Sequence, residues 1–148
     1  MFSPGTVCLA VHIVGTVVAV GAVAVTDALT IMTKLRPKCM KVLVFFSPFL
    51  SMLVWGGFFL LAVSGSALLL VGRGDPGNPL FQFKMLLTGL VFVNGIIMTE
   101  YIVPRFERLV KNECYDLPPS LHRLAVGSAT LSVLGWWGAT FVAYFLIE

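Results

Sequence analysis

The chain has 148 residues, of which 58% are hydrophobic and 11% are charged, and its formal net charge at pH 7 is +3. Soluble domains carry about 25% charged residues, so this composition excludes an ordinary soluble enzyme and predicts an integral membrane protein. The length suits a single domain over residues 1–148, and the position of the basic residues beside apolar segments excludes nucleic-acid binding.

Four apolar segments follow one another along the chain, each longer than the ~20 residues that a membrane-spanning helix needs. We predict helices over residues 6–32, 42–71, 80–103 and 121–147. Pro37 is expected to end the first helix and Pro104 the third, because proline lacks the backbone N–H that a helix interior requires. Ser120 is expected to cap the fourth helix. Short connections favour an all-α fold, an antiparallel four-helix bundle in the membrane.

Basic residues gather at two of the three connections between these helices. The first and third connections are flanked by Lys34, Arg36, Lys38, Lys41, Arg105, Arg108, Lys111 and Arg123. The second connection has only Arg73 and Lys84. The positive-inside rule therefore predicts that connections one and three are cytoplasmic and that both termini lie outside, in an inner or cytoplasmic membrane. The first apolar segment is too long for a signal peptide, and we expect it to be a retained anchor.

Small residues are frequent in the apolar segments. Three cysteines, Cys8, Cys39 and Cys114, are isolated in the sequence, so they form no CxxC motif and are expected to be packing residues. Glycines allow close approach of helix backbones in membranes, and we expect this role for Gly15, Gly21, Gly56, Gly57, Gly65, Gly89, Gly95, Gly127, Gly135 and Gly138.

Two basic residues lie inside apolar segments, where ionisable groups are costly and usually functional. His12 lies near the start of the first helix and Lys84 near the start of the third, so the predicted topology places them at the same depth. His12 is either hydrogen-bonded to a neighbouring helix or an axial ligand of haem iron. Lys84 either extends to the headgroups or acts as a second ligand, or as a cation for a propionate or another anionic group. His122 is expected at the opposite face, which excludes a pair of histidines around one haem.

Acidic and amide side chains form a second group. Asp27 and Glu100 are expected at similar depth near the cytoplasmic face, and Asn94 lies in the middle of the third helix. One interpretation is a structural network, with Arg105 or the lysines of the first connection neutralising the acids and Asn94 bonding between helices. The other is a proton- or cation-binding site. Trp55, Trp136 and Trp137 fit either core packing or the wall of a cofactor pocket.

The early histidine and the lysine support a resemblance to a known family. His12 in LAVHIVGTVVAVGAVAVTDAL and Lys84 in PLFQFKMLLTGLVFVNGI resemble the HemJ-type protoporphyrinogen oxidases and the broader CopD-like membrane proteins, with a weaker similarity in SATLSVLGWWG. The resemblance implies haem b held by His12 and Lys84 and, if the protein is an enzyme, a membrane oxidoreductase acting on a porphyrinogen or a similar redox substrate. Where the family has further basic and histidine residues, this chain has Asp27 and Asn94, so the resemblance implies haem binding more than porphyrinogen oxidation.

Three functional hypotheses remain open from the sequence. The first is a haem-binding redox protein that uses His12 and Lys84. The second is a small oligomeric transporter of ions or solutes that uses Asp27, Glu100 and Asn94. The third is a non-catalytic subunit or assembly factor of a larger membrane complex. Soluble enzyme classes are excluded further because the chain has no P-loop, dinucleotide-binding glycine motif, HExxH or GxSxG sequence.

Overall fold

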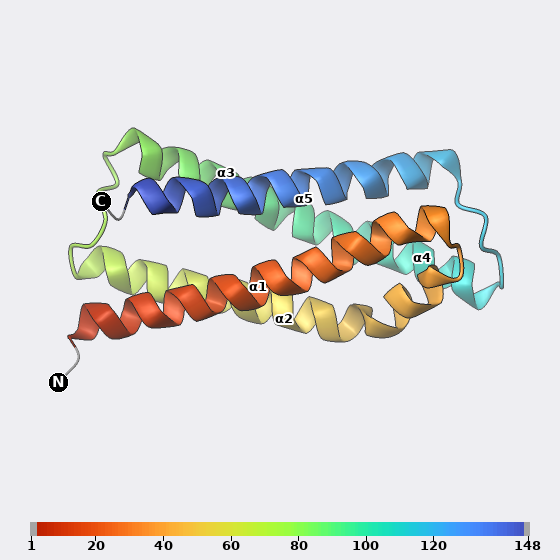
Figure 1. The fold of residues 1–148 in the computed structure, drawn as a ribbon, viewed down its shortest axis with the longest axis horizontal. Helices are drawn as coiled ribbons and strands as arrows, with labels where there is room; N and C mark the ends of the chain where they lie inside the picture. Colours follow the sequence, from red (N-terminus) through yellow and green to blue (C-terminus); the bar gives the residue numbers. More distant parts are fainter. Residues whose placement is uncertain (1–2, 147–148) are drawn as a thin grey trace.

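The computed structural model describes residues 3–146, apart from the side chain of Lys34. All secondary structure in this part of the chain is helical. Four of its helical segments are long and apolar enough to cross a membrane. The elements in chain order are α1 (Pro4–Leu35), α2 (Cys39–Leu70), α3 (Pro79–Ile97), the π-helical segment η1 (Met98–Ile102), α4 (Val103–Lys111) and α5 (Pro119–Phe145) (Figure 1).

The prediction that Pro104 ends the third helix is wrong. The helical path continues from α3 through η1 into α4, and it ends only at Lys111. In η1 each backbone hydrogen bond spans five residues instead of the four of an α-helix. The Val103 N–H, for example, donates to the Met98 carbonyl. Pro104 therefore lies in the first turn of a new α-helix, where its missing N–H is not needed.

The other predicted helices are found, with different ends. α1 and α2 begin two or three residues earlier than predicted, and Ser3 caps α1 by accepting from the Thr6 N–H. The prediction that Ser120 caps the last helix is wrong, because α5 begins at Pro119, whose fixed φ suits the first helical position. The predicted end at residue 147 lies outside the described residues.

α2 passes through Pro48 without interruption. Proline cannot donate to the carbonyl four residues earlier, which belongs to Val44. The Ser47 hydroxyl donates to that carbonyl instead, at 2.9 Å. The side chain thus replaces the missing backbone donor.

The long helices are arranged in two pairs. α1 packs mainly against α2, and α3 packs mainly against α5 (Figure 1). Contacts between the pairs are made chiefly by α1 with α5 and by α2 with α4. The connections after α1 and after α4 lie at one end of the assembly, the Arg36 end, and the connection between α2 and α3 lies at the other, the Gly72 end. At Gly72, a φ of +73° ends α2 in a conformation that favours glycine.

The glycine prediction is only partly right. A Cβ on Gly57 of α2 would lie 2.7 Å from the Ala19 Cβ and 3.0 Å from the Gly15 carbonyl, so these residues bring the backbones of α1 and α2 together. Gly135 of α5 lies even closer to the Val91 side chain of α3. A Cβ would meet nothing within 4 Å at Gly21, Gly56, Gly89 and Gly127, so these four are not packing contacts between the described helices.

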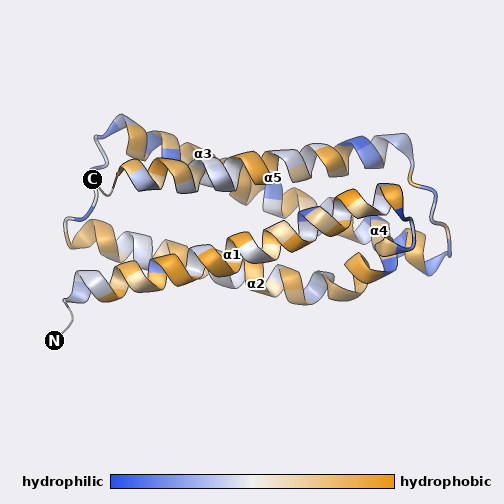
Figure 2. Cartoon of the chain, viewed as in Figure 1, coloured by the Kyte–Doolittle hydropathy of each residue, from blue (hydrophilic) through white to orange (hydrophobic). Residues whose placement is uncertain are grey.

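Two buried apolar clusters join the pairs. The central cluster consists of Ala19, Phe58, Val91 and Trp136, one from each long helix. The Arg36-end cluster consists of Met40, Leu43, Ile102, Phe106, Leu121 and Ala125. Hydrophilic residues gather mainly at the connections and helix ends, and the helices between them are largely hydrophobic (Figure 2).

Candidate functional site

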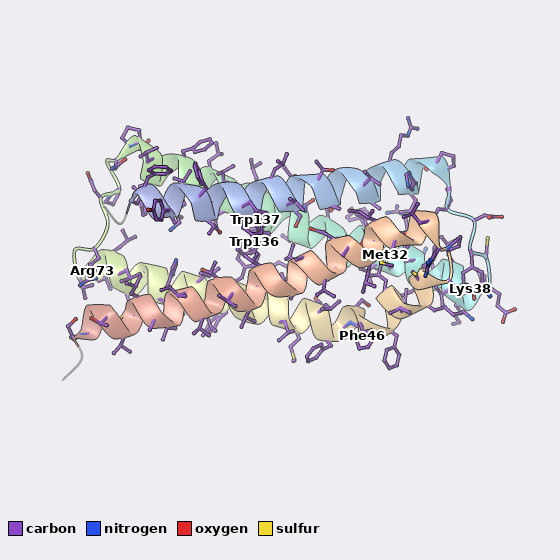
Figure 3. The ribbon with its side chains drawn as sticks, in the orientation of Figure 1. Met32, Lys38, Phe46, Arg73, Trp136 and Trp137 are labelled. Carbon is purple, nitrogen blue, oxygen red and sulfur yellow. The ribbon has the colours of Figure 1, made fainter. Side chains whose placement is uncertain are left out.

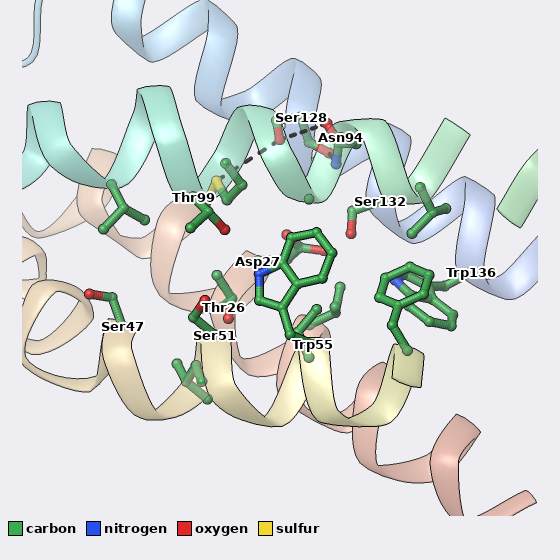
Figure 4. A pocket seen from close by; sticks show the side chains of 18 residues that line it. Thr26, Asp27, Ser47, Ser51, Trp55, Asn94, Thr99, Ser128, Ser132 and Trp136 are labelled. Atoms are coloured by element: carbon green, nitrogen blue, oxygen red, sulfur yellow. Dashed lines mark hydrogen bonds between the residues drawn. The ribbon is translucent and has the colours of Figure 1, made fainter. Parts of the chain in front are cut away.

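A cavity of about 70 Å³ lies inside the assembly between the two apolar clusters (Figure 4). The volume per water in the liquid is about 30 Å³, so the cavity has room for a few waters or one small ligand. All four long helices contribute to the lining. Its polar side chains are those of Thr26, Asp27, Ser47, Ser51, Asn94, Thr99, Ser128 and Ser132.

Asp27 is the charged residue of this cavity. It lies on the face of α1 that also carries Ala19 and Val23, and 6% of its surface is exposed. It faces the Ser132 hydroxyl of α5. Its Oδ2 atom is buried without a hydrogen-bond partner among residues 3–146. The lining residues of the described chain include no lysine, arginine or histidine. A buried carboxylate without a counter-charge is strongly unfavourable, so this site needs a positive charge or a proton from elsewhere.

Aromatic rings form the wall of the cavity toward the Gly72 end. Trp55, Phe58 and Trp136 all line it. The Phe58 ring centroid lies 5.0 Å from that of Trp136 and 5.9 Å from that of Trp55. The Trp136 Nε1 is buried and lacks a hydrogen-bond partner in the described structure. Trp137, the next residue, is 64% exposed, so the two adjacent tryptophans have different environments (Figure 3).

Asn94 and Ser128 form a polar bridge between α3 and α5. The Asn94 Nδ2 donates to the Ser128 carbonyl at 3.0 Å, and the Ser128 hydroxyl donates to the Asn94 Oδ1 at 2.9 Å (Figure 4). Interhelical amide bonds of this kind hold membrane helices in register. Both residues line the cavity, and the bridge fixes the turn of α5 that precedes Ser132. Asn94 thus positions the wall of the cavity opposite Asp27.

The structure brings only two of the three predicted polar residues together. Asp27 and Asn94 line one cavity, while Glu100 is exposed and is not among the lining residues. Its neighbour Thr99 lines the cavity instead. Arg105 also lies elsewhere: its Nη1 donates to the Tyr101 carbonyl, and its guanidinium lies 5.4 Å from the centre of the Tyr101 ring.

The serines of the cavity were not predicted as site residues. They occur in two pairs spaced by four residues, Ser47 with Ser51 on α2 and Ser128 with Ser132 on α5. Residues four apart share one face of a helix. This spacing of hydroxyls in apolar helices is a sequence signal for a polar stripe facing the interior.

His12 lies apart from the cavity, on the side of the Gly72 end. Its Nδ1 is hydrogen-bonded to the Ser64 hydroxyl of α2, at 3.0 Å. Ser64 also donates to the Leu60 carbonyl of its own helix. Since the hydroxyl hydrogen is used there, the tautomer with Nδ1–H as the donor to Ser64 fits this contact, and in that tautomer Nε2 has the ring's lone pair. Lys84 of α3 is within electrostatic range of His12, and neither residue lines the cavity.

Few side chains of the described residues could act as ligands of a metal ion. The described residues contain no group of three or more histidine, cysteine or acidic side chains that could hold a metal ion. Haem iron needs one or two axial ligands, for which the free His12 Nε2 is suitable and Lys84 is the second basic group nearby. The three cysteines are free and do not contribute to such a group.

Comparisons of the chain with protein-family models, with curated proteins and with solved structures find no match.

Proposed function

We propose that this protein is an integral membrane transporter of cations, an antiparallel four-helix bundle whose binding residue is Asp27. The observation that carries the proposal is the Asp27 carboxylate, buried in a cavity without a basic partner among the lining residues of the described chain. An acidic residue deep inside a membrane protein typically marks an ion or proton pathway.

The surface of the helices supports membrane insertion. Large apolar side chains face outward along every long helix, including Phe45 with 78% of its surface exposed and Leu70 with 89%. A soluble protein rarely exposes such a continuous apolar surface, whereas lipid tails solvate it without cost. The uneven distribution of basic residues favours an orientation with the Arg36 end in the cytoplasm and both termini outside.

The cavity lies between two apolar layers, the central cluster and the Arg36-end cluster, and this position supports transport rather than simple binding. The central cluster, with the Phe58 and Trp136 rings, separates Asp27 from the Gly72 end. The Arg36-end cluster separates it from the other face. Opening one layer at a time would expose the site alternately, and the two helix pairs provide bodies that can move against each other. One four-helix chain is narrow for an aqueous path, so we propose a homo-oligomer as the working unit.

The test is cation flux into proteoliposomes that contain the purified protein. Uptake of protons, Na⁺, K⁺ and methylammonium is measured under an imposed membrane potential for wild type, Asp27→Asn and Glu100→Gln. We expect at least one cation to be taken up, with uptake falling to the level of protein-free liposomes in Asp27→Asn. Glu100→Gln is the matched control, because Glu100 is exposed and lies outside the cavity. Equal flux in wild type and Asp27→Asn would contradict the proposal.

Haem b ligation is the second candidate. The Ser64 bond to Nδ1 favours it, because histidines that bind metals usually donate their other ring N–H to a fixed acceptor. His12 would be the axial ligand through Nε2, and Lys84 the second ligand or a partner of a propionate. Haem would supply one-electron redox chemistry when bound.

The absorption spectrum of the protein purified in mild detergent tests this candidate. If haem b is bound, dithionite reduction is expected to sharpen α and β bands beside a Soret band, and His12→Ala is expected to lose them. Ser64→Ala should keep the bands and shift the reduction potential, since it removes only the acceptor of the Nδ1–H. A colourless preparation after expression with a haem precursor would exclude this candidate.

A further inference from the structure

The chemistry of the cavity wall indicates which cation Asp27 receives. We infer that the ligand is a small organic ammonium ion of single positive charge, such as methylammonium. The inference rests on the proposed function, in which Asp27 binds a cation. It follows from three properties of the cavity: its single carboxylate, its aromatic wall and its size.

The single negative charge of the cavity does not suit a divalent metal ion. Asp27 contributes one negative charge, and the described residues contain no group of three acidic, histidine or cysteine side chains. Hard cations such as Mg²⁺ and Ca²⁺ take about six oxygen ligands. The Asn94 Oδ1 accepts from Ser128 and keeps a second lone pair, but it is neutral, as are the hydroxyls, so Asp27 supplies the only charge among the lining residues of the described chain. A single ammonium group, in contrast, needs only the Asp27 Oδ2 and one or two hydroxyls such as that of Ser132.

The aromatic wall attracts this kind of ligand. Trp55, Phe58 and Trp136 lie side by side and line the cavity next to the carboxylate. The face of an aromatic ring attracts ammonium groups, most strongly for tryptophan and when water is excluded. The rings add no oxygen ligand for Na⁺ or K⁺, so Asp27 and the hydroxyls alone would have to replace the hydration shell of these ions. Alkyl groups on the ammonium would pack against Val54 and Val91, which also line the cavity.

The volume limits the ligand to a few heavy atoms. A cavity of about 70 Å³ accommodates methylammonium together with one water, which can accept from the unpartnered Trp136 Nε1–H. Tetraethylammonium is much larger than methylammonium and is expected to fit a cavity of this size poorly. Selection by size is therefore expected along with selection by charge.

The test is a titration of the intrinsic tryptophan fluorescence of the full chain in mild detergent. Methylammonium chloride is compared with NaCl, KCl and tetraethylammonium chloride at equal ionic strength. We expect a saturable change with methylammonium, at a concentration about tenfold lower than for any other salt. Asp27→Asn should abolish the change, and Glu100→Gln should leave it intact. Trp55→Leu should weaken binding by about fivefold or more, whereas Trp55→Phe retains a ring and should weaken it less.

The outcomes separate the inference from the proposed function. Na⁺ or K⁺ binding as tightly as methylammonium, or an Asp27-dependent proton flux without methylammonium binding, would overturn the inference and leave the proposed function standing. The absence of any Asp27-dependent flux or binding would overturn both. The comparison among salts in wild type is decisive even if a substituted protein fails to fold.

Discussion

Replacing Gly57 with valine is expected to destabilise the protein by about 3 kcal/mol or more, because overpacking of a well-packed core typically costs roughly 1–3 kcal/mol and the neighbours here include backbone atoms that cannot move aside. A Cβ at Gly57 would lie 2.7 Å from the Ala19 Cβ, 2.9 Å from the Ala19 backbone nitrogen and 3.0 Å from the Gly15 carbonyl. Two of these neighbours are backbone atoms of α1, so the helices must separate. The α1–α2 pair would then lose the close contact on which Asp27 depends for its position.

Gly56→Val is the matched control for this prediction. Gly56 is adjacent in sequence and in the same helix, yet a Cβ there would meet nothing within 4 Å. Both variants add the same side chain and have the same effect on helix propensity. Both variants are compared in detergent by thermal unfolding and, separately, by size-exclusion chromatography. Gly56→Val should be monodisperse, and Gly57→Val should be strongly destabilised or aggregated. Similar stability of the two variants would show that α1 and α2 are not in backbone contact at this point.

Replacing Phe106 with alanine is expected to destabilise the protein by about 3 kcal/mol, as is typical when a buried phenylalanine is truncated. Phe106 is fully buried in the Arg36-end cluster, at 0% exposure, against residues of α2, η1 and α5. Truncation leaves an empty cavity, and the side chains around it lose their van der Waals contacts with the ring. This loss is the same whether water or lipid surrounds the protein. Because this cluster closes one side of the Asp27 site, the variant is also expected to leak cations in proteoliposomes.

Phe45→Ala removes the same ring from a position that is 78% exposed on α2, and it serves as the control. Its stability should stay within about 0.5 kcal/mol of wild type, as for most surface substitutions. The two variants are compared by thermal unfolding and by passive cation leak. If Phe106→Ala unfolds at the same temperature as Phe45→Ala and shows the same passive cation leak, the Arg36-end cluster does not close this end of the helix assembly.

The four helices could be predicted from the sequence because long apolar segments leave no other fold, but two of their ends could not. Pro104 looks like a stop signal, and only the change in hydrogen bonding through Met98–Ile102 makes it a start signal for α4. Likewise, Gly56 and Gly57 are equivalent in the sequence. The rotation of α2 against α1 alone decides which of them is in contact with Ala19.

The candidate site could be predicted in part. Asp27 and Asn94 were predicted because polar groups are rare in apolar helices, and both line the cavity. Glu100 was grouped with them by depth, but depth does not give the direction of a side chain, and the π-helical turn places Thr99 at the cavity instead. The serines were missed because a hydroxyl can bond to its own helix backbone, so its presence in an apolar helix is not unusual.

The connection of residues 71–78 acts as a tether between two half-molecules. Since most contacts are made within the α1–α2 and α3–α5 pairs, the association of the pairs is a weak intramolecular binding event. A short tether holds such partners at an effective concentration on the order of millimolar. Modest contacts between the pairs are then enough to keep them together. In the proposed transport cycle, loop length as much as side-chain packing would set how readily the two halves separate and reassociate around Asp27.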